Sequence, residues 1–376
     1  LTEPPLYRLS CRKPIWLRLL QSFDLSPIPD LSPSECQPTL LKLLAGPNIA
    51  SKHWVYRQYD HQVGTNTVVP PGDDAAVLRI KDTKKAISLT TDGNGRYCYL
   101  DPYSGGAMAV AEAARNLVCT GAEPLAITDC LNLGNPEKTD VYYQLKECIK
   151  GMARACRLLN IPVISGNVSL YNETKGKAIY PTPVVGMVGL IEDVDRHCTS
   201  GFKDEGDVVF LLGSQDEGGL AGSEYLEVIH ELIAGRPFID LDLEKRVQRC
   251  CLSLIKEGII KSAHDCSDGG LAVALAECCL AGDVGFRGGW EIQGRRDAAL
   301  FGELPSRIIV SVAPTRAIEL AERSAREGIG WGKLGVVRGE RLVIEGLVDV
   351  PLEQMAMMWH NGLDWALRGL TKGGSR

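Results

Sequence analysis

Residues 161–173, IPVISGNVSLYNE, contain the pattern that decides the fold class. The apolar residues at 161–164 predict a buried strand. Gly166 follows, and then Asn167 and Ser169 place an amide and a hydroxyl on positions of the same parity, so an extended backbone would point both side chains to one face. Polar groups at the end of a buried strand are typical of ligand sites in α/β proteins. The alternative is a polar turn with an asparagine cap.

The segments around this stretch alternate between strand and helix patterns. Before residue 195 we predict strands at 75–80, 86–91, 125–128 and 183–191 and helices at 51–61, 104–119 and 135–159. The pattern changes at 195–205, and a second α/β unit follows. There we predict strands at 208–212, 307–312, 333–336 and 341–344 and helices at 223–233, 243–256, 269–280 and 352–367.

These patterns predict an α/β (α+β) chain of 376 residues with two domains, 40–197 and 198–376. Residues 1–39 contain seven prolines, too many for regular structure, and predict a linker or arm. Within it, Ser32 and Glu35 have capping-box spacing, although Pro38 would disturb that helix. Because the chain begins with Leu1 and not Met, we expect a processed product or a piece of something longer.

Composition excludes several classes of protein. With 45% hydrophobic and 23% charged residues, the chain is neither disordered nor a coiled coil. Its 41 Lys and Arg against 47 Asp and Glu give a net charge of -6, which argues against a nucleic-acid partner. No apolar window is long enough for a membrane span, and no signal peptide is visible. Thirteen cysteines without a C-x-x-C motif predict free thiols in the cytoplasm.

Further loops carry groups suited to metal or phosphate. In PGDDAAV at 71–77, Asp73 and Asp74 could hold Mg²⁺, although on spacing alone a solvated turn is favoured. In TTDGNGRY at 90–97, Asp92 could take a metal and the glycine amides an anion, but the Walker A and Rossmann patterns are absent. Asp129, at the end of the 125–128 strand, is expected at the same sheet edge as Asn167.

A fourth loop, HDCSDGGL at 264–271, opens a helix with two glycines. Its N-terminus could take phosphate, or Ser267 or Asp268 could simply cap the helix. No catalytic triad, zinc spacing or HExxH motif is present. The residues alone therefore indicate a two-domain α/β protein with Mg²⁺ and phosphate-type loops, and they name no reaction.

Longer strings point to a family. They are PNIASK at 47–52, YDHQV at 59–63, TTDGNGRYCYLDP at 90–102, ITDCLNLGNP at 127–136, SGNVSLYNE at 165–173 and YPTPVVGMVG at 180–189. In them the chain resembles the C-terminal half of the large synthetase subunit of phosphoribosylformylglycinamidine synthase, with the linker before it. The resemblance implies an aminoimidazole ribonucleotide synthetase-like architecture: a barrel-forming N-terminal domain and a C-terminal α/β domain.

The resemblance also implies a reaction in purine synthesis. ATP with Mg²⁺ activates the amide oxygen of formylglycinamide ribonucleotide (FGAR) as an iminophosphate. Ammonia from a glutaminase subunit, joined by a small bridging subunit, then displaces phosphate and yields the amidine (FGAM). Carried over by position, Asp129 and Gly166 resemble ATP contacts, Asn167 a Mg²⁺ ligand and Ser169 a substrate contact.

The chain departs from the family's first half. Asn94 stands where that half has its catalytic histidine, and Arg115-Asn116 where it has Arg-Asp. No residue of this chain is therefore assigned as catalytic. The chain's own pseudo-symmetric site would be an auxiliary nucleotide site with Asp73, Asp74 and Asp92 as metal ligands. Glu303-Leu304-Pro305 replaces a common Glu-Ser-Gln, which weakens a working second site.

Two alternatives stay open at this point. The isolated half could be a scaffold that binds nucleotide and catalyses nothing. A third candidate is another member of the superfamily, such as a thiamine-monophosphate kinase or a hydrogenase maturation protein, because these share Gly-Asp-Asp-Ala-Ala-Val-like loops. The strings at 90–102 and 165–173 argue against that third candidate.

Overall fold

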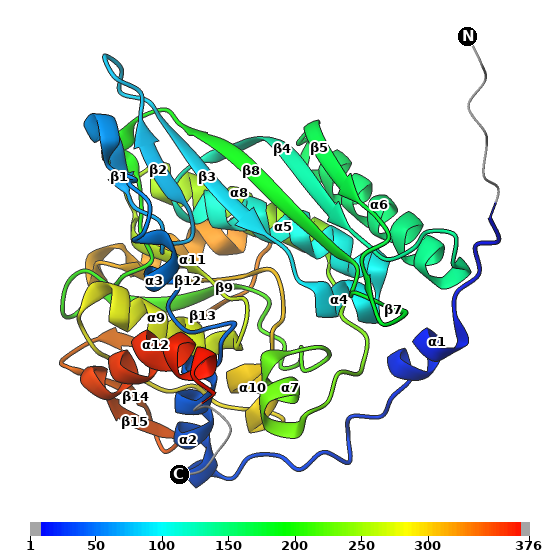
Figure 1. The fold of residues 1–376 in the computed structure, drawn as a ribbon. Helices are drawn as coiled ribbons and strands as arrows, with labels where there is room; N and C mark the ends of the chain where they lie inside the picture. The colour runs from blue at the N-terminus through cyan, green and yellow to red at the C-terminus, as the bar shows by residue number, and fades with distance from the viewer. Residues whose placement is uncertain (1–8, 370–376) are drawn as a thin grey trace.

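The computed structural model describes residues 9–369, which form two lobes, each built on an open sheet (Figure 1). The first sheet has the order β1-β2-β3-β8-β4-β5, and only β4 and β5 are parallel neighbours. Its strands are β1 (Thr67–Val69), β2 (Ala76–Arg79), β3 (Ala86–Asp92), β4 (Glu123–Asn132), β5 (Val163–Ser169) and β8 (Thr182–Ile191). A small hairpin, β6 (Glu173–Thr174) and β7 (Lys177–Ala178), lies between β5 and β8 in the chain.

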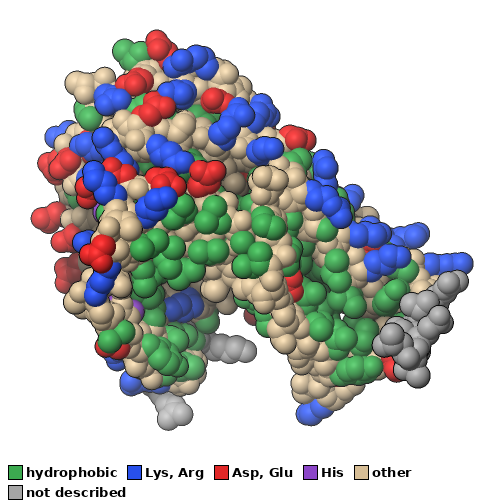
Figure 2. All heavy atoms as spheres, turned by 90° about the horizontal axis from the view of Figure 1, so that it is seen from above, with side chains coloured by type: hydrophobic (Ala, Val, Ile, Leu, Met, Phe, Trp, Pro, Cys, Tyr) green, Lys and Arg blue, Asp and Glu red, His purple; other side chains and the backbone are tan. Residues whose placement is uncertain are grey.

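Two helices cover one face of this sheet. They are α5 (Pro102–Cys119) and α6 (Thr139–Leu159), and apolar side chains of β4 and β8 are buried against them. The opposite face is open and holds a hollow of about 350 Å³, lined in part by Leu89 and Ile164. Figure 2, which looks down on the molecule from above, shows hydrophobic side chains gathered across this side. Among residues 9–369, the first lobe therefore has one packed face and one face that no other element covers.

The second sheet has helices on both faces. Its order is β10-β12-β9-β13-β11-β14-β15. Alternate side chains of β9 enter two different cores: Val209 and Leu211 pack with α9, and Phe210 and Leu212 pack with α8. The strands are β9 (Val208–Gly213), β10 (Ile260–Asp265), β11 (Phe286–Gly288), β12 (Arg307–Val312), β13 (Trp331–Val337), β14 (Arg341–Ile344) and β15 (Val348–Pro351).

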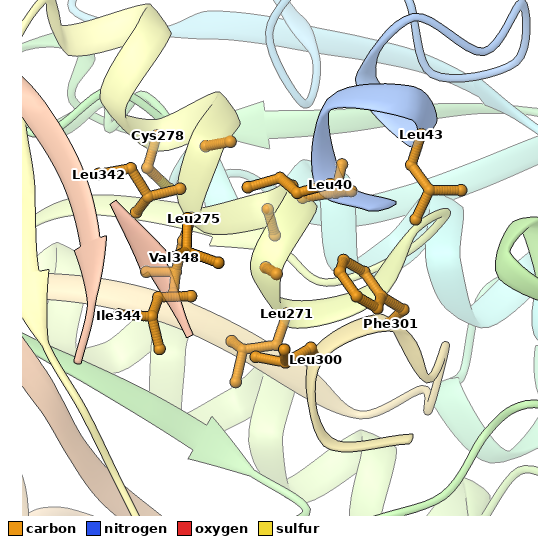
Figure 3. Packing of buried hydrophobic residues seen from close by; sticks show 14 of the residues in the cluster. Leu40, Leu43, Leu271, Leu275, Cys278, Leu300, Phe301, Leu342, Ile344 and Val348 are labelled. Atoms are coloured by element: carbon orange, nitrogen blue, oxygen red, sulfur yellow. The ribbon is translucent and has the colours of Figure 1, made fainter. Parts of the chain in front are cut away.

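The remaining helices are short or belong to the second lobe. They are α1 (Ile15–Gln21), α2 (Pro33–Leu44), α3 (His53–Tyr56), α4 (Gly95–Leu100), α7 (Glu224–His230), α8 (Leu241–Lys256), α9 (Gly270–Gly282), α10 (Arg296–Phe301), α11 (Ala317–Arg326) and α12 (Leu352–Leu367). Figure 3 shows side chains of α2, α9, α10, β14 and β15 meeting in one core, with Leu40, Leu271 and Ile344 among them.

Helix α2 differs from its prediction. The capping box forms, because the Glu35 carboxylate accepts from the Ser32 backbone N–H at 2.8 Å. Pro38 does not break the helix, which continues to Leu44. Leu40 and Leu43 are fully buried in the core of the second lobe. The predicted boundary between residues 39 and 40 therefore falls inside a helix that packs on the second lobe.

A buried ionic network joins the lobes. The Arg115 guanidinium, on α5, pairs with Asp265 at the end of β10, and its Nη1 lies 2.9 Å from both Glu244 carboxylate oxygens. Glu244 also accepts from Gln248 Nε2 at 2.7 Å and from Ser306 Oγ at 2.6 Å. One guanidinium thus serves two carboxylates, and each of the three groups is hydrogen-bonded, which buried ions require. Buried side chains of Arg115, Glu244 and Asp265 therefore connect the two lobes.

Several sequence expectations are corrected. In place of the predicted helix at 51–61, the structure has only the short helix α3. Strand β4 continues to Asn132, beyond the end of its apolar run at Thr128. Within the described residues both sheets are open, so the structure does not confirm the predicted barrel. No helix among those residues has the length and apolar character needed to cross a membrane.

Candidate functional site

The loop before β2 places two carboxylates between the lobes. Asp73 Oδ1 accepts from the Ser200 backbone N–H at 3.1 Å, so Asp73 ties the loop to the second lobe. Asp74 Oδ1 lies 2.9 Å from His264 Nδ1, and His264 Nε2 lies 3.3 Å from Glu277. The second oxygen of Asp74 is buried and has no partner among the described residues. Burial raises the pKa of Asp74 to about 6, against the opposing effect of His264.

The end of β3 places a third carboxylate beside helix α5. Asp92 Oδ2 accepts from Asn116 Nδ2 at 2.8 Å. Burial, with the negative charge of Asp265 nearby, raises the pKa of Asp92 to about 8. One helical turn before Asn116, Glu112 forms no hydrogen bond or ion pair with any described residue, and burial raises its pKa well above the usual range.

These groups line one cavity of about 620 Å³ between the lobes. The cavity holds the three predicted residues Asp73, Asp74 and Asp92 together, and Glu112 and Asn116 join them. The sequence patterns do not single out Glu112, and Asn116 appears there only as a departure from the family's Arg-Asp pair. The signal that could have found both is a Glu and an Asn four residues apart in an Ala-rich helix that is mostly buried.

One backbone amide at the N-terminus of α9, that of Gly269, is already occupied. The Gly269 backbone N–H donates to Glu303 Oε1 at 2.7 Å, and the Tyr97 hydroxyl donates to the other carboxylate oxygen. Burial raises the pKa of Glu303 to about 8. The predicted phosphate position is therefore wrong at this amide, because a carboxylate of the chain occupies it. The alternative prediction also fails, because α9 has no side-chain cap from Ser267 or Asp268.

Asn94 has a structural role at the start of α4. Its side-chain oxygen accepts from the backbone N–H groups of Arg96 and Tyr97, at 3.0 and 3.2 Å. Its amide nitrogen donates to Asp268 Oδ1 at 3.2 Å. The residue that stands at the family's histidine position thus caps a helix and joins the lobes.

The second group of predicted residues lies on β4 and β5. These strands pair in parallel, with Asp129 opposite Gly166 and Cys130 opposite Asn167. A Cβ added at Gly166 would lie 2.7 Å from Asp129 Oδ1, so glycine leaves room for the carboxylate. Burial raises the pKa of Asp129. The sequence pattern predicts Asp129 at the sheet edge of Asn167, and the two strands are indeed neighbours.

Side-chain direction separates these residues. Because neighbouring positions of a strand face opposite sides, Asp129 and Asn167 do not share a face. Asn167 and Ser169 do, and both lie on the outer edge strand, where Asn167 is exposed. Ser169 Oγ lies 3.1 Å from Asn172 Nδ2. A ligand touching both Asp129 and Asn167 would have to pass over this strand edge.

Two family models match the chain. The model of the AIR synthase related protein N-terminal domain matches residues 72–191, and that of its C-terminal domain matches residues 204–346. The chain belongs to the AIR synthase related family. The family predicted from the sequence strings is confirmed, and so is the α/β fold class with these two domains.

Curated members of this family that match the chain are named phosphoribosylformylglycinamidine synthase subunit PurL. The one from Thermomicrobium roseum is 52% identical over 365 residues, 96% of this chain and 50% of the relative. The one from Caldanaerobacter subterraneus subsp. tengcongensis is 48% identical over 370 residues, 97% of this chain and 50% of the relative. The chain spans about half the length of the curated relatives it matches.

Solved structures of the family agree with the fold. Thermotoga maritima PurL complexed with FGAR superposes with a TM-score of 0.70 at 18% identity, over 85% of this chain and 53% of that one. The same protein complexed with AMPPCP gives 0.55 at 29% identity, over 77% and 42%. At 18% identity the first likeness supports the fold alone.

Proposed function

We propose that the chain is the C-terminal half of an ATP-dependent FGAM synthase, which amidates FGAR in purine biosynthesis. The relatives named PurL, at about half coverage, support this assignment. The observation that carries it is the exposed edge strand β5, which presents Asn167 and Ser169 beside an open sheet face. An edge strand is a ready position for pairing with another chain or domain.

The chemistry divides between the halves. When bound, Mg²⁺ would neutralise the phosphate charge of ATP in the transfer to the amide oxygen. We assign Asp129 and Gly166 to ATP, Asn167 to the metal and Ser169 to FGAR, in a site completed by a first half. The exposed amide of Asn167 and the exposed backbone of Gly166 are accessible for these roles. Ammonia would come from a glutaminase subunit with a small bridging subunit.

A test of this assignment is Asn167→Ala in the enzyme assembled with the first half of a PurL relative. We expect kcat/KM for ATP to fall by about 10- to 100-fold, partly restored by higher Mg²⁺ concentration, because a metal ligand is lost. The control is Val168→Ala on the same strand, an exposed residue of opposite parity, which should stay within about twofold of the parent. Unchanged steady-state kinetics in Asn167→Ala would contradict the assignment.

We further propose that the cavity between the lobes is the auxiliary nucleotide site. Among residues 9–369, no group of three or more His, Cys, Asp and Glu is already arranged around a metal position. The donors nevertheless suit Mg²⁺, which prefers oxygen ligands. Asp74 keeps an unpartnered buried oxygen, and Glu112 has no partner in the described chain. Asp73, Asp74 and Asp92 stay candidate ligands, with Glu112 and Asn116 added.

The scaffold alternative, in which the isolated half binds nucleotide and catalyses nothing, is tested at this cavity. Asn94 stands where the resemblance implies the catalytic histidine, and it caps α4 and donates to Asp268. Glu303 occupies the Gly269 backbone N–H that could have bound phosphate. The auxiliary site would therefore bind nucleotide without turnover. Isothermal titration of the chain with ADP and Mg²⁺ tests this: binding that Asp74→Asn weakens supports it, and absence of binding in the parent opposes it.

The barrel is proposed as a joint structure of two halves. The open face of the first sheet exposes Leu89 by 42% and Ile164 by 68%, and β5 has a free edge within the described part of the chain. Exposed apolar faces of this kind mark interaction surfaces. We also propose a reducing cytoplasmic location, because all thirteen cysteines lie in the described part of the chain and are free thiols.

Self-association of the isolated chain follows from the same face. We expect sedimentation velocity to show a concentration-dependent shift to dimers or larger species, since burying this face excludes water from apolar surface. Ile164→Lys should reduce the association. Ile318→Lys, at a residue 75% exposed on α11 in the other lobe, should not. A parent chain that stays monomeric at high concentration would contradict the proposed barrel face.

A further inference from the structure

The N-terminal arm is attached to the first lobe next to α4. Leu17 of α1 is fully buried. Gln21 Nε2 donates to the Leu100 carbonyl at 2.6 Å, and the Leu20 carbonyl accepts from the Gly235 backbone N–H at 3.0 Å. The arm is therefore a fixed element with defined contacts in both lobes.

Three aromatic rings continue from this arm. The Trp16 ring on α1 stacks on Tyr99 of α4, with centroids 5.0 Å apart and planes 19° apart. Tyr99 stacks in turn on Tyr180, at 4.5 Å and 24°. Stacked pairs at these separations are a favourable arrangement for aromatic rings. The stack connects the arm, through α4, to residues 170–181.

Residues 170–181 begin directly after Ser169. Asn172 Nδ2 donates to the Ser169 carbonyl at 2.9 Å and lies 3.1 Å from its hydroxyl. The Ile179 backbone N–H donates to the Asn172 carbonyl at 3.1 Å. Tyr180 follows Ile179, so a short path of contacts leads from the stacked ring to the Ser169 side chain.

This segment depends on contacts from outside. Its own strands, β6 and β7, have two residues each. Tyr171 and Lys175 have φ values of 62° and 51°, in the left-handed region that non-glycine residues rarely occupy. Such conformations persist when the surroundings hold them. The stacking of Tyr99, on α4, against Tyr180 is a contact that can hold this segment.

We propose that Trp16 is a positioning residue, which acts through Tyr99 and Tyr180 to hold residues 170–181 and thereby the orientation of Ser169. The effect on substrate rests on the proposed function, in which Ser169 contacts FGAR. The effect of Trp16 on the conformation of residues 170–181 does not depend on the proposed function.

Limited trypsin digestion of the whole chain tests the effect on the segment. Lys175 and Lys177 are exposed in its turn, and cleavage there requires local opening. Trp16→Ala should accelerate cleavage after these lysines by about three- to tenfold, as loss of one aromatic stack predicts. Trp16→Phe should stay near the parent rate. Tyr180→Leu, at the other end of the stack, should reproduce the acceleration.

The matched control is Leu19→Ala. Leu19 lies on the same helix but is 66% exposed, so its loss should leave cleavage unchanged. Cleavage rates equal to the parent in both Trp16→Ala and Tyr180→Leu would overturn the inference. Equal acceleration by Leu19→Ala would also overturn it, because the cause would then be general loosening of the arm.

Kinetics of the assembled enzyme test the effect on substrate. Trp16→Ala should raise KM for FGAR by about three- to tenfold with kcat within about twofold, and Trp16→Phe should restore it. A normal KM together with faster cleavage would overturn the link to Ser169. An inactive parent assembly would instead refute the proposed function, and the digestion would still decide the positioning of the segment.

Discussion

The isolated 376-residue chain should form no FGAM from FGAR, ATP and ammonium ions. Asn94 stands at the position of the family's histidine, and an amide, unlike an imidazole, is not basic enough to accept a proton near neutral pH. The Asn94 side chain instead caps α4 and donates to Asp268. In the part of the chain that the structure describes, the strand with Asn167 and Ser169 is a sheet edge, and in our proposal another half completes the site there. The measurement is FGAM formation together with release of ADP in steady state.

The positive control is the same assay after addition of the first half of a PurL relative. Activity should then appear with ammonium ions and depend on ATP. Ammonium-dependent formation of FGAM by the isolated chain would refute the division of the site between two halves. Binding of nucleotide without product would agree with it.

Arg115→Ala should destabilise the fold more than loss of any surface ion pair. It leaves the carboxylates of Glu244 and Asp265 buried without their cation, and breaking a buried pair in this way costs about 3–5 kcal/mol. In urea denaturation followed by circular dichroism, we expect the midpoint to fall sharply. The first lobe should separate from the second before or together with global unfolding.

The control for this prediction is Arg249→Ala. Arg249 also pairs with a carboxylate, Glu327, but its side chain is 64% exposed. A surface pair of this kind contributes at most about 1 kcal/mol. If Arg115→Ala lost no more stability than Arg249→Ala, the buried network would not be what holds the lobes together.

Long periodic elements could be predicted from the sequence, and polar strand ends could not. Helix α12 and strand β12 occupy the predicted residues, because their patterns are strong and local. The sequence pattern places Asp265 in a loop, but Asp265 ends strand β10. Asp265 pairs with Arg115, which lies 150 residues earlier in the chain, and no local sequence pattern indicates that partner.

The candidate site shows the same limit. Asp74 and Asp92 stand out in sequence because each lies in a glycine-containing loop next to a predicted strand. Glu112 is hidden inside a helix whose other residues predict only packing. The α9 glycines suggest an anion site, yet the Gly269 backbone N–H donates to the side chain of Glu303, which comes from elsewhere in the chain. Residue types could therefore be predicted, whereas the identity of each partner required the tertiary structure.

Because α2 packs in its core, the second lobe is built from two separate segments of the chain. Residues 33–44 precede the first lobe in the chain, whereas the elements that pack on α2, namely α7, α9, β15 and α12, follow that lobe. A fragment cut at residue 198 would lack the helix that fills its core, and added α2 peptide should be able to complement it. During synthesis, the apolar side chains of α2 therefore stay uncovered until the second lobe has been made.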